Sequence, residues 1–199
     1  MKTARWTTQI QYSMIVLALV AVSTSQSQAQ NSQSDALTMH HEMVSGQNNS
    51  QAGALIRVVR QATARFRDVS VAEAEGYSLQ FGCVSGPDSG AMGLHFVNGA
   101  IVASGVLDAT RPQIVIYEPQ PDGHLKLIGA DYLLIASAWD ASHSGPPELM
   151  GQLFQYFETP NRFGLPAFYT LHVWAWKDNP NGAFVNWHPH VSCQAFSGN

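Results

Sequence analysis

Apolar residues recur at three- and four-residue spacing between residues 55 and 69, which is the pattern of an amphipathic helix. The apolar stripe consists of Leu55, Val58, Val59, Ala62, Phe66 and Val69. The arginines of this stretch fall mostly off the stripe, so we expect them on the side that faces solvent. A second, short helix is expected to begin at Ser70, because Ser70 and Glu73 have the spacing of a capping box. The pattern therefore predicts a long helix that buries one face against the rest of the domain.

Farther along the chain, runs rich in β-branched and aromatic residues are typical of strands. Turn residues between Pro119 and Gly123 predict a hairpin, and Gly129 is expected to mark a bulge in its second strand. Apolar residues at helical spacing predict a further helix at residues 148–157. The strands are expected at residues 94–97, 113–118, 124–136 and 168–176.

The connections between these strands are short, which favours antiparallel pairing between neighbours. Helices are expected before the first strand and between later ones. The order of elements therefore predicts an α+β fold, in which a curved antiparallel sheet or partly closed barrel packs against the long N-terminal helix.

The first 29 residues have the features of a cleavable signal peptide. Lys2 and Arg5 precede an apolar run at residues 14–22, and small residues stand at Ser27 and Ala29, before the expected cleavage site. A membrane-spanning helix needs about 20 apolar residues, so we expect no stable membrane anchor after cleavage. The sequence thus predicts a signal peptide at 1–29, a flexible polar leader at 30–50 and a single globular domain at 51–199. The protein is expected to be exported, and either periplasmic or secreted.

Both cysteines, Cys83 and Cys193, lie in the expected mature part of the chain. An even number of cysteines in an oxidising compartment predicts a disulfide. The bridge would tie the end of the chain back to the start of its core.

The charged residues of the chain limit the classes of partner that it could bind. Only 12% of the residues are charged, and cleavage would leave eight basic residues against 14 acidic ones. Nucleic-acid binding needs a basic surface, so the sequence indicates no nucleic-acid partner. It gives no indication of the oligomeric state.

Three ionisable side chains stand on the expected strands among apolar neighbours: His95, Glu118 and His172. A buried charge is costly unless it is paired or bound to a metal ion. Two histidines and one carboxylate form the ligand set of a facial triad, which suits iron and zinc and leaves a position open for water or substrate. We therefore predict one transition-metal ion (iron, copper, zinc or manganese) in a metal-binding protein or metalloenzyme.

His188 and His190 form a His-x-His pair and are a second candidate for metal binding. Side chains two residues apart share a face in a strand, but outside a regular strand the rings on either side of Pro189 can point apart. A polar surface segment is therefore the simpler interpretation.

A non-enzymatic function is the alternative hypothesis. Trp174 and Trp176 are two residues apart near the end of the last expected strand. An exposed pair of indole rings would suit a small apolar or sugar ligand. The chain would then be a binding module, and a purely structural role in the cell envelope is a third interpretation.

Five short segments of the chain carry a resemblance to other proteins: Phe81-Gly82-Cys83, residues 92–98, Tyr117-Glu118-Pro119, residues 171–174 and Val191-Ser192-Cys193. They are similar to segments of a group of uncharacterised exported bacterial proteins. The resemblance covers most of residues 55–193, implies a bacterial exported protein and supplies no catalytic residues.

Overall fold

The computed structural model describes residues 37–47 and 49–198, and the chain divides into two units, residues 1–49 and 50–199. In the first unit, residues 37–47 are helical and almost all of their side chains are exposed. These residues belong to the segment expected as a polar leader, whereas the expected signal peptide lies outside the described residues. No helix within 37–47 and 49–198 has both the length and the hydropathy needed to cross a bilayer.

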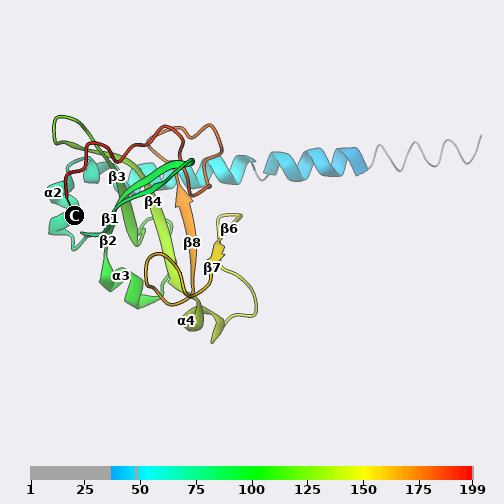
Figure 1. The fold of residues 1–199 in the computed structure, drawn as a ribbon. Coiled ribbons are helices and arrows are strands. Elements are labelled where there is room, and N and C mark those ends of the chain that lie inside the picture. The colour runs from blue at the N-terminus through cyan, green and yellow to red at the C-terminus, as the bar shows by residue number, and fades with distance from the viewer. Residues whose placement is uncertain (1–36, 48, 199) are drawn as a thin grey trace, which may run out of the picture. The chain divides into compact units, whose positions relative to one another are not determined.

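The second unit is built on a six-stranded antiparallel sheet that curls into half a barrel (Figure 1). Its strands lie in the order β1-β2-β3-β4-β8-β7. They are β1 (Ser78–Gly86), β2 (Gly90–Val97), β3 (Ile114–Pro119), β4 (Leu125–Ile135), β7 (Gln155–Phe157) and β8 (Phe168–Val173). Two further short strands, β5 (Glu148–Leu149) and β6 (Gln152–Leu153), form a separate ribbon.

The helical elements precede the sheet or connect its strands. Residues 50–63 are helical and continue into the 3-10 turn η1 (Ala64–Arg67). Three short helices follow: α2 (Val69–Ala74), α3 (Gly99–Ser104) and α4 (Ala136–Asp140). The predicted α+β class, a curved antiparallel sheet with a long N-terminal helix, is therefore confirmed.

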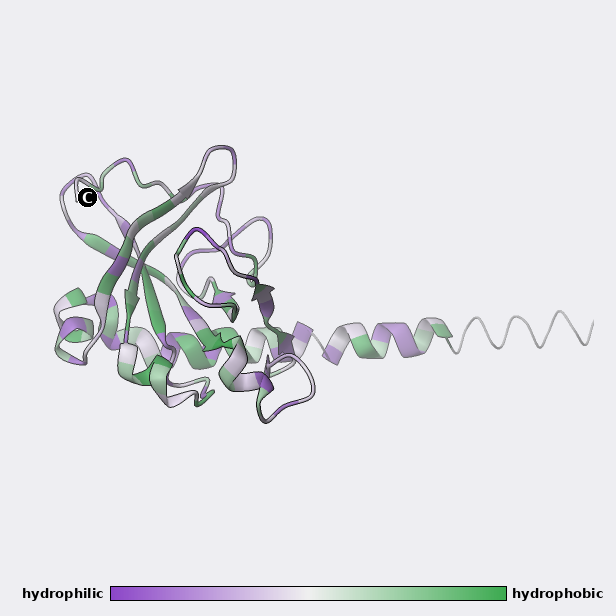
Figure 2. Cartoon of the chain, turned by 60° about the horizontal axis from the view of Figure 1, so that its bottom comes forward, coloured by the Kyte–Doolittle hydropathy of each residue, from purple (hydrophilic) through white to green (hydrophobic). Residues whose placement is uncertain are grey.

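The helix of residues 50–63 covers one face of the sheet. Leu55 and Val59 are fully buried there among apolar residues of β4 and β8, and Phe66 of η1 packs against β2 and β3. Figure 2 shows the hydrophobic residues concentrated on the strands and on the helix beside them. This apolar layer matches the stripe expected from the sequence.

The opposite face of the sheet carries the polar residues of interest. Side chains alternate between the two faces of a strand. His95, Asp131 and His172 each stand between two residues that pack toward the helix. They therefore project from the other face, where a second apolar cluster includes Ile116 and Trp174.

Two glycines permit the tight curl of the sheet. A Cβ atom added at Gly93 of β2 would lie 2.6 Å from the carbonyl oxygen of Tyr117, and one at Gly129 of β4 would lie 2.6 Å from that of Val173. Beside Gly129, Ile128 is the extra residue of a bulge, because Ile116 and Tyr117 of β3 pair with Gly129 and Leu127. The bulge expected near Gly129 is thus present, and β4 can approach β8 closely.

Replacing Gly129 with alanine is expected to destabilise the fold by about 1–3 kcal/mol, because the new methyl group has to displace the β8 backbone. The free energy of unfolding from urea titration measures this effect. Gly145→Ala is the matched control, since nothing lies within 4 Å of a Cβ atom at Gly145. Equal stability of the two variants would contradict the close approach of β4 and β8.

Local expectations for two segments have to be corrected. Residues 148–157 form the short strands β5 and β6, the turn between them, and then β7 rather than a helix. Met150 and Gly151 in that turn both have positive φ angles, which interrupt a helix. The short helix expected from Ser70 is α2, but its N-cap is Asp68, which accepts a hydrogen bond from the Ser70 amide at 3.0 Å.

The disulfide between Cys83 and Cys193 is present, as predicted, and joins β1 to the C-terminal segment. The Cα atoms are 5.7 Å apart, and the bridge closes a loop of 110 residues. A structural disulfide of this kind fits an extracellular or periplasmic location.

Candidate metal centre

Three buried side chains meet on the face of the sheet that turns away from the helix: His95 of β2, Asp131 of β4 and His172 of β8. They are 5%, 3% and 3% exposed, respectively. One ligand atom from each lies within 4.8 Å of those of the other two. Imidazole nitrogens and a carboxylate oxygen are established metal ligands, so this cluster can hold a metal ion.

The curl of the sheet brings the two histidines together. β2 and β8 are separated by β3 and β4 in the strand order, which would place them about 14 Å apart in a flat sheet. The Nε2 atoms of His95 and His172 are nevertheless only 3.4 Å apart. Asp131 lies directly opposite His172 in the pairing of β4 with β8, so the register of these strands positions the carboxylate.

The hydrogen bonds of His95 determine which of its nitrogens is free. Its Nδ1 atom lies 3.2 Å from the carbonyl oxygen of Gly93. A carbonyl only accepts, so Nδ1 carries the proton and Nε2 keeps its lone pair. Donation from the far nitrogen to a backbone carbonyl is how metal-binding histidines are commonly oriented. The free Nε2 of His95 points at His172.

His172 has an unsatisfied buried atom. Its Nδ1 atom has no hydrogen-bond partner and lies 3.4 Å from Oδ2 of Asp131, outside hydrogen-bond geometry. If Nε2 of His172 donated to His95, the bare Nδ1 lone pair would face a carboxylate, which is unfavourable. If the proton is on Nδ1 of His172 instead, this N–H group is attracted to the carboxylate of Asp131. The lone pairs on Nε2 of His95 and Nε2 of His172 then face each other.

Asp131 is held by its neighbours in the sheet. Its Oδ1 atom accepts a hydrogen bond of 2.6 Å from the hydroxyl of Thr170. Burial raises the pKa of Asp131 to about 6, although the hydrogen bond from the Thr170 hydroxyl acts in the opposite direction. Its second oxygen, Oδ2, is the one nearest His172, and it could bind a metal ion.

Burial lowers the pKa of both histidines, to about 4 for His95 and about 3 for His172. A protonated, charged ring at either position would be buried away from water without a fully formed ion pair to compensate. Both imidazoles are therefore neutral at pH 7, which is the state that binds a metal ion.

The metal-free protein is expected to lose stability as the pH falls from about 6 to 4. In the unfolded chain both histidines take up protons near pH 6.5, whereas the folded chain protonates only Asp131 over this range. The unfolded state thus binds about one proton more, which lowers the free energy of unfolding by roughly 1.4 kcal/mol per pH unit. Urea titrations in the presence of a chelator at pH 7, 6, 5 and 4 measure this slope.

Two histidine variants test whether this pH dependence comes from the cluster. His124→Ala, at an exposed turn position, is expected to keep the slope. His95→Asn is expected to remove it, because one of the two buried bases is then absent. A slope that is unchanged in His95→Asn would contradict the neutral, buried state of His95.

A narrow cavity adjoins the cluster. The space open to the centre of a water-sized sphere is about 30 Å³, and the whole hollow, with its open mouth, measures about 380 Å³. Its wall is mainly apolar and includes Phe81, Phe157, Phe163 and Phe168. The inner space suffices for a very small number of water molecules or small ligand atoms.

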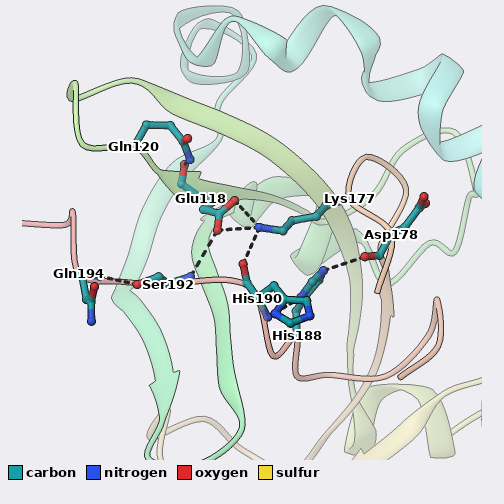
Figure 3. A network of polar contacts seen from close by, with 8 residues as sticks. All are labelled: Glu118, Gln120, Lys177, Asp178, His188, His190, Ser192 and Gln194. Atoms are coloured by element: carbon teal, nitrogen blue, oxygen red, sulfur yellow. Dashed lines mark hydrogen bonds and ion pairs between the residues drawn. The ribbon is translucent and has the colours of Figure 1, made fainter. Parts of the chain in front are cut away.

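Glu118, the carboxylate expected in the metal site, is not part of this cluster. Figure 3 shows both of its oxygens contacting Nζ of Lys177, each at 2.8 Å. The Ser192 amide also approaches Glu118, at 3.4 Å. Glu118 therefore serves as the partner of a lysine, and Asp131 is the carboxylate beside the two histidines.

The His188 and His190 pair does not converge on one point either. Nδ1 of His188 accepts from the His190 amide at 3.0 Å, and its Nε2 lies 3.1 Å from the carbonyl oxygen of Asp178 (Figure 3). Both ring nitrogens of His188 are thus used within the fold. This pair orders the C-terminal segment beside Lys177, whose ammonium group contacts the His190 carbonyl at 2.6 Å.

The two tryptophans do not form a common platform. β8 ends at Val173, so the alternation expected to place Trp174 and Trp176 on one face stops before them. Trp174 is buried and donates to the carbonyl oxygen of Val185 at 2.5 Å. Trp176 donates to the hydroxyl of Thr63 at 2.9 Å and packs with the core beside the helix.

Asp131 is the member of the cluster that the sequence pattern did not select. It stands in the middle of the second hairpin strand, between apolar residues. An acidic residue at such a position is a signal in its own right, because a buried carboxylate needs partners. The sequence would have pointed to Asp131 as the partner of His172 if the register of β4 with β8 had been known.

Comparison with known proteins supplies no relative for this chain. No protein-family model, no curated protein and no solved structure matches it. The resemblance to exported bacterial proteins therefore stays a prediction, and the chemistry of the cluster has to be inferred from its geometry.

Proposed function

We propose that this protein is an exported metalloprotein that holds one divalent transition-metal ion between His95, Asp131 and His172. The observation that carries the proposal is the pair of Nε2 atoms 3.4 Å apart, one of which has its lone pair free. A bound ion between them would allow the unsatisfied Nδ1 of His172 to keep its proton and face Asp131. The polar atoms of the cluster are then better satisfied with an ion than without one.

The separation of the two nitrogens favours zinc. Zinc binds imidazole nitrogen at about 2.0–2.1 Å in a tetrahedral arrangement, so two such ligands lie about 3.3–3.4 Å apart. The Nε2 atoms of His95 and His172 already have this spacing.

Three protein ligands would leave one position of a tetrahedral ion open, as in catalytic rather than structural zinc sites. The cavity beside the cluster gives that position a route to solvent. An ion held there would polarise a bound carbonyl or lower the pKa of a bound water molecule. We therefore propose a metalloenzyme, with the disulfide and the signal-like N-terminus supporting a periplasmic or secreted location.

Metal content and metal titration of the disulfide-bonded protein, purified without a histidine tag, test this proposal. The expected result is one zinc ion per chain after incubation with zinc, together with a higher melting temperature that a chelator reverses. Stoichiometric iron, copper or manganese in place of zinc would keep the site and change its chemistry. A folded protein that binds none of these ions would overturn the proposal.

A further inference from the structure

The hollow that leads to the cluster is walled by a connected group of phenylalanine rings. Phe81 of β1 meets Phe163 edge to face, with ring centroids 5.4 Å apart. Phe163 contacts Phe168 at 6.2 Å, and Phe168 stacks on Phe157 at 5.1 Å. Aromatic rings in this arrangement form a continuous apolar wall, which suits a ligand with an apolar body.

Two polar atoms in this wall make no hydrogen bond of good geometry. Oδ1 of Asn186 and Nδ1 of His172 are both buried and unsatisfied, and both residues line the cavity. The side chain of Asn186 nevertheless lies close enough to His172 to raise its pKa against the effect of burial, so one small polar group could contact both atoms. The amide nitrogen of Asn186 donates to Oε1 of Gln155 at 2.8 Å, which fixes the side chain. Leaving a buried polar atom unpaired is costly, so a ligand group that satisfies these atoms would gain affinity.

We propose that the cavity binds a small, largely apolar ligand with one hydroxyl group. The hydroxyl enters the narrow inner space and donates to Oδ1 of Asn186, while the apolar body stays in the open mouth of the hollow, against the phenylalanine wall. A hydroxyl group is both a donor and an acceptor, so it also accepts from Nδ1–H of His172. The inference rests on the proposed function, because the bound hydroxyl lies beside the histidine that holds the ion. It names the class of substrate: phenols and other small alcohols of similar size.

The backbone at the mouth of the cavity supports a binding role. Phe81 is 46% exposed and has a φ angle of 64°, which is unusual for a residue with a side chain. Phe81 and Gly82 are the two residues of β1 that have no partner in β2, so the strand bulges there. Strained positions of this kind cluster at ligand sites, and this one places an exposed ring over the cavity.

Phenol is the probe, and benzene is its control, because the two differ by one hydroxyl group. Their affinities are measured by ligand-observed NMR or calorimetry, on the full mature protein loaded with zinc and on the same protein in chelator. Phenol is expected to bind the wild-type protein about tenfold more tightly than benzene. Asn186→Leu is expected to abolish this preference, because it removes the acceptor and keeps a side chain of similar size.

Phe81→Asn separates binding from folding. Asparagine adopts positive φ more readily than phenylalanine, so the variant is expected to fold at least as stably as the wild type. It is expected to bind phenol about fivefold more weakly, since one ring of the wall is lost. Tyr156→Asn is the matched control, because Tyr156 is exposed on β7 but does not line the cavity, and it should bind phenol as the wild type does.

The outcomes distinguish this inference from the proposed function. Zinc binding without any phenol binding would overturn the inference and leave the metal site in place. Phenol binding that needs Asn186, in a protein that takes up no metal, would overturn the metal site and support the ligand site. Equal affinity for phenol and benzene in the wild-type protein would overturn the role of Asn186.

Discussion

Replacing His172 with alanine is expected to weaken zinc binding by at least about 100-fold. Loss of a residue that merely orients a metal ligand typically costs 10- to 100-fold in affinity, and His172 is proposed as a ligand itself. The remaining pair, His95 and Asp131, would bind an ion only weakly. Competition with a chromophoric chelator at pH 7 measures the affinity.

Two controls show whether this loss is specific to the cluster. His124→Ala removes an exposed histidine of the β3–β4 turn and is expected to bind zinc as the wild type does. Glu118→Gln removes the carboxylate that pairs with Lys177, and it is also expected to keep the affinity, since Glu118 is outside the cluster. Zinc affinity that fell in Glu118→Gln and persisted in His172→Ala would exclude the proposed ligand set.

Removal of the disulfide is expected to produce the largest loss of stability. A double Cys83→Ala, Cys193→Ala variant should lose about 2–5 kcal/mol in the free energy of unfolding, because a cross-link over 110 residues strongly restricts the unfolded chain. For a domain of this size the melting temperature should fall by roughly 10 °C. Urea titration and thermal melting followed by circular dichroism measure both quantities.

Reduction of the wild-type protein provides the comparison for the disulfide. The reduced wild type and the double variant should have similar stability, since neither contains the cross-link. The variant that remains folded should bind zinc normally, because His95, Asp131 and His172 are positioned by the pairing of β2, β3, β4 and β8 and not by the bridge. A loss below about 0.5 kcal/mol would mean that the bridge contributes little to the fold.

Much of the architecture follows from local patterns in the sequence. The apolar stripe that includes Leu55 and Val59 predicted the helix, and the β-branched runs predicted β3, β4 and β8 in nearly the positions observed. These signals are local, since they depend on spacing within a single element. Residues 148–157 show their limit: apolar spacing suggested a helix, but the Met150-Gly151 turn prevents one.

The candidate site depended on information that local patterns lack. His95 and His172 were selected because each is an ionisable residue in an apolar strand, and the curled sheet brings them together. Selecting the carboxylate required the register of β4 against β8, which pairs Asp131 with His172. Glu118 fitted the same local rule, but its surroundings include Lys177, which lies 59 residues away in the chain.

The cluster draws its three members from three separate strands, so a metal ion could bind it only once the chain has folded. Its members lie 36 and 41 residues apart in the sequence, so no short segment of the unfolded chain contains two of the three proposed ligands. The binding site exists only after β2, β3, β4 and β8 have paired and curled. If the cluster holds an ion, as proposed, the compartment in which the sheet closes and the ions available there decide which metal enters it.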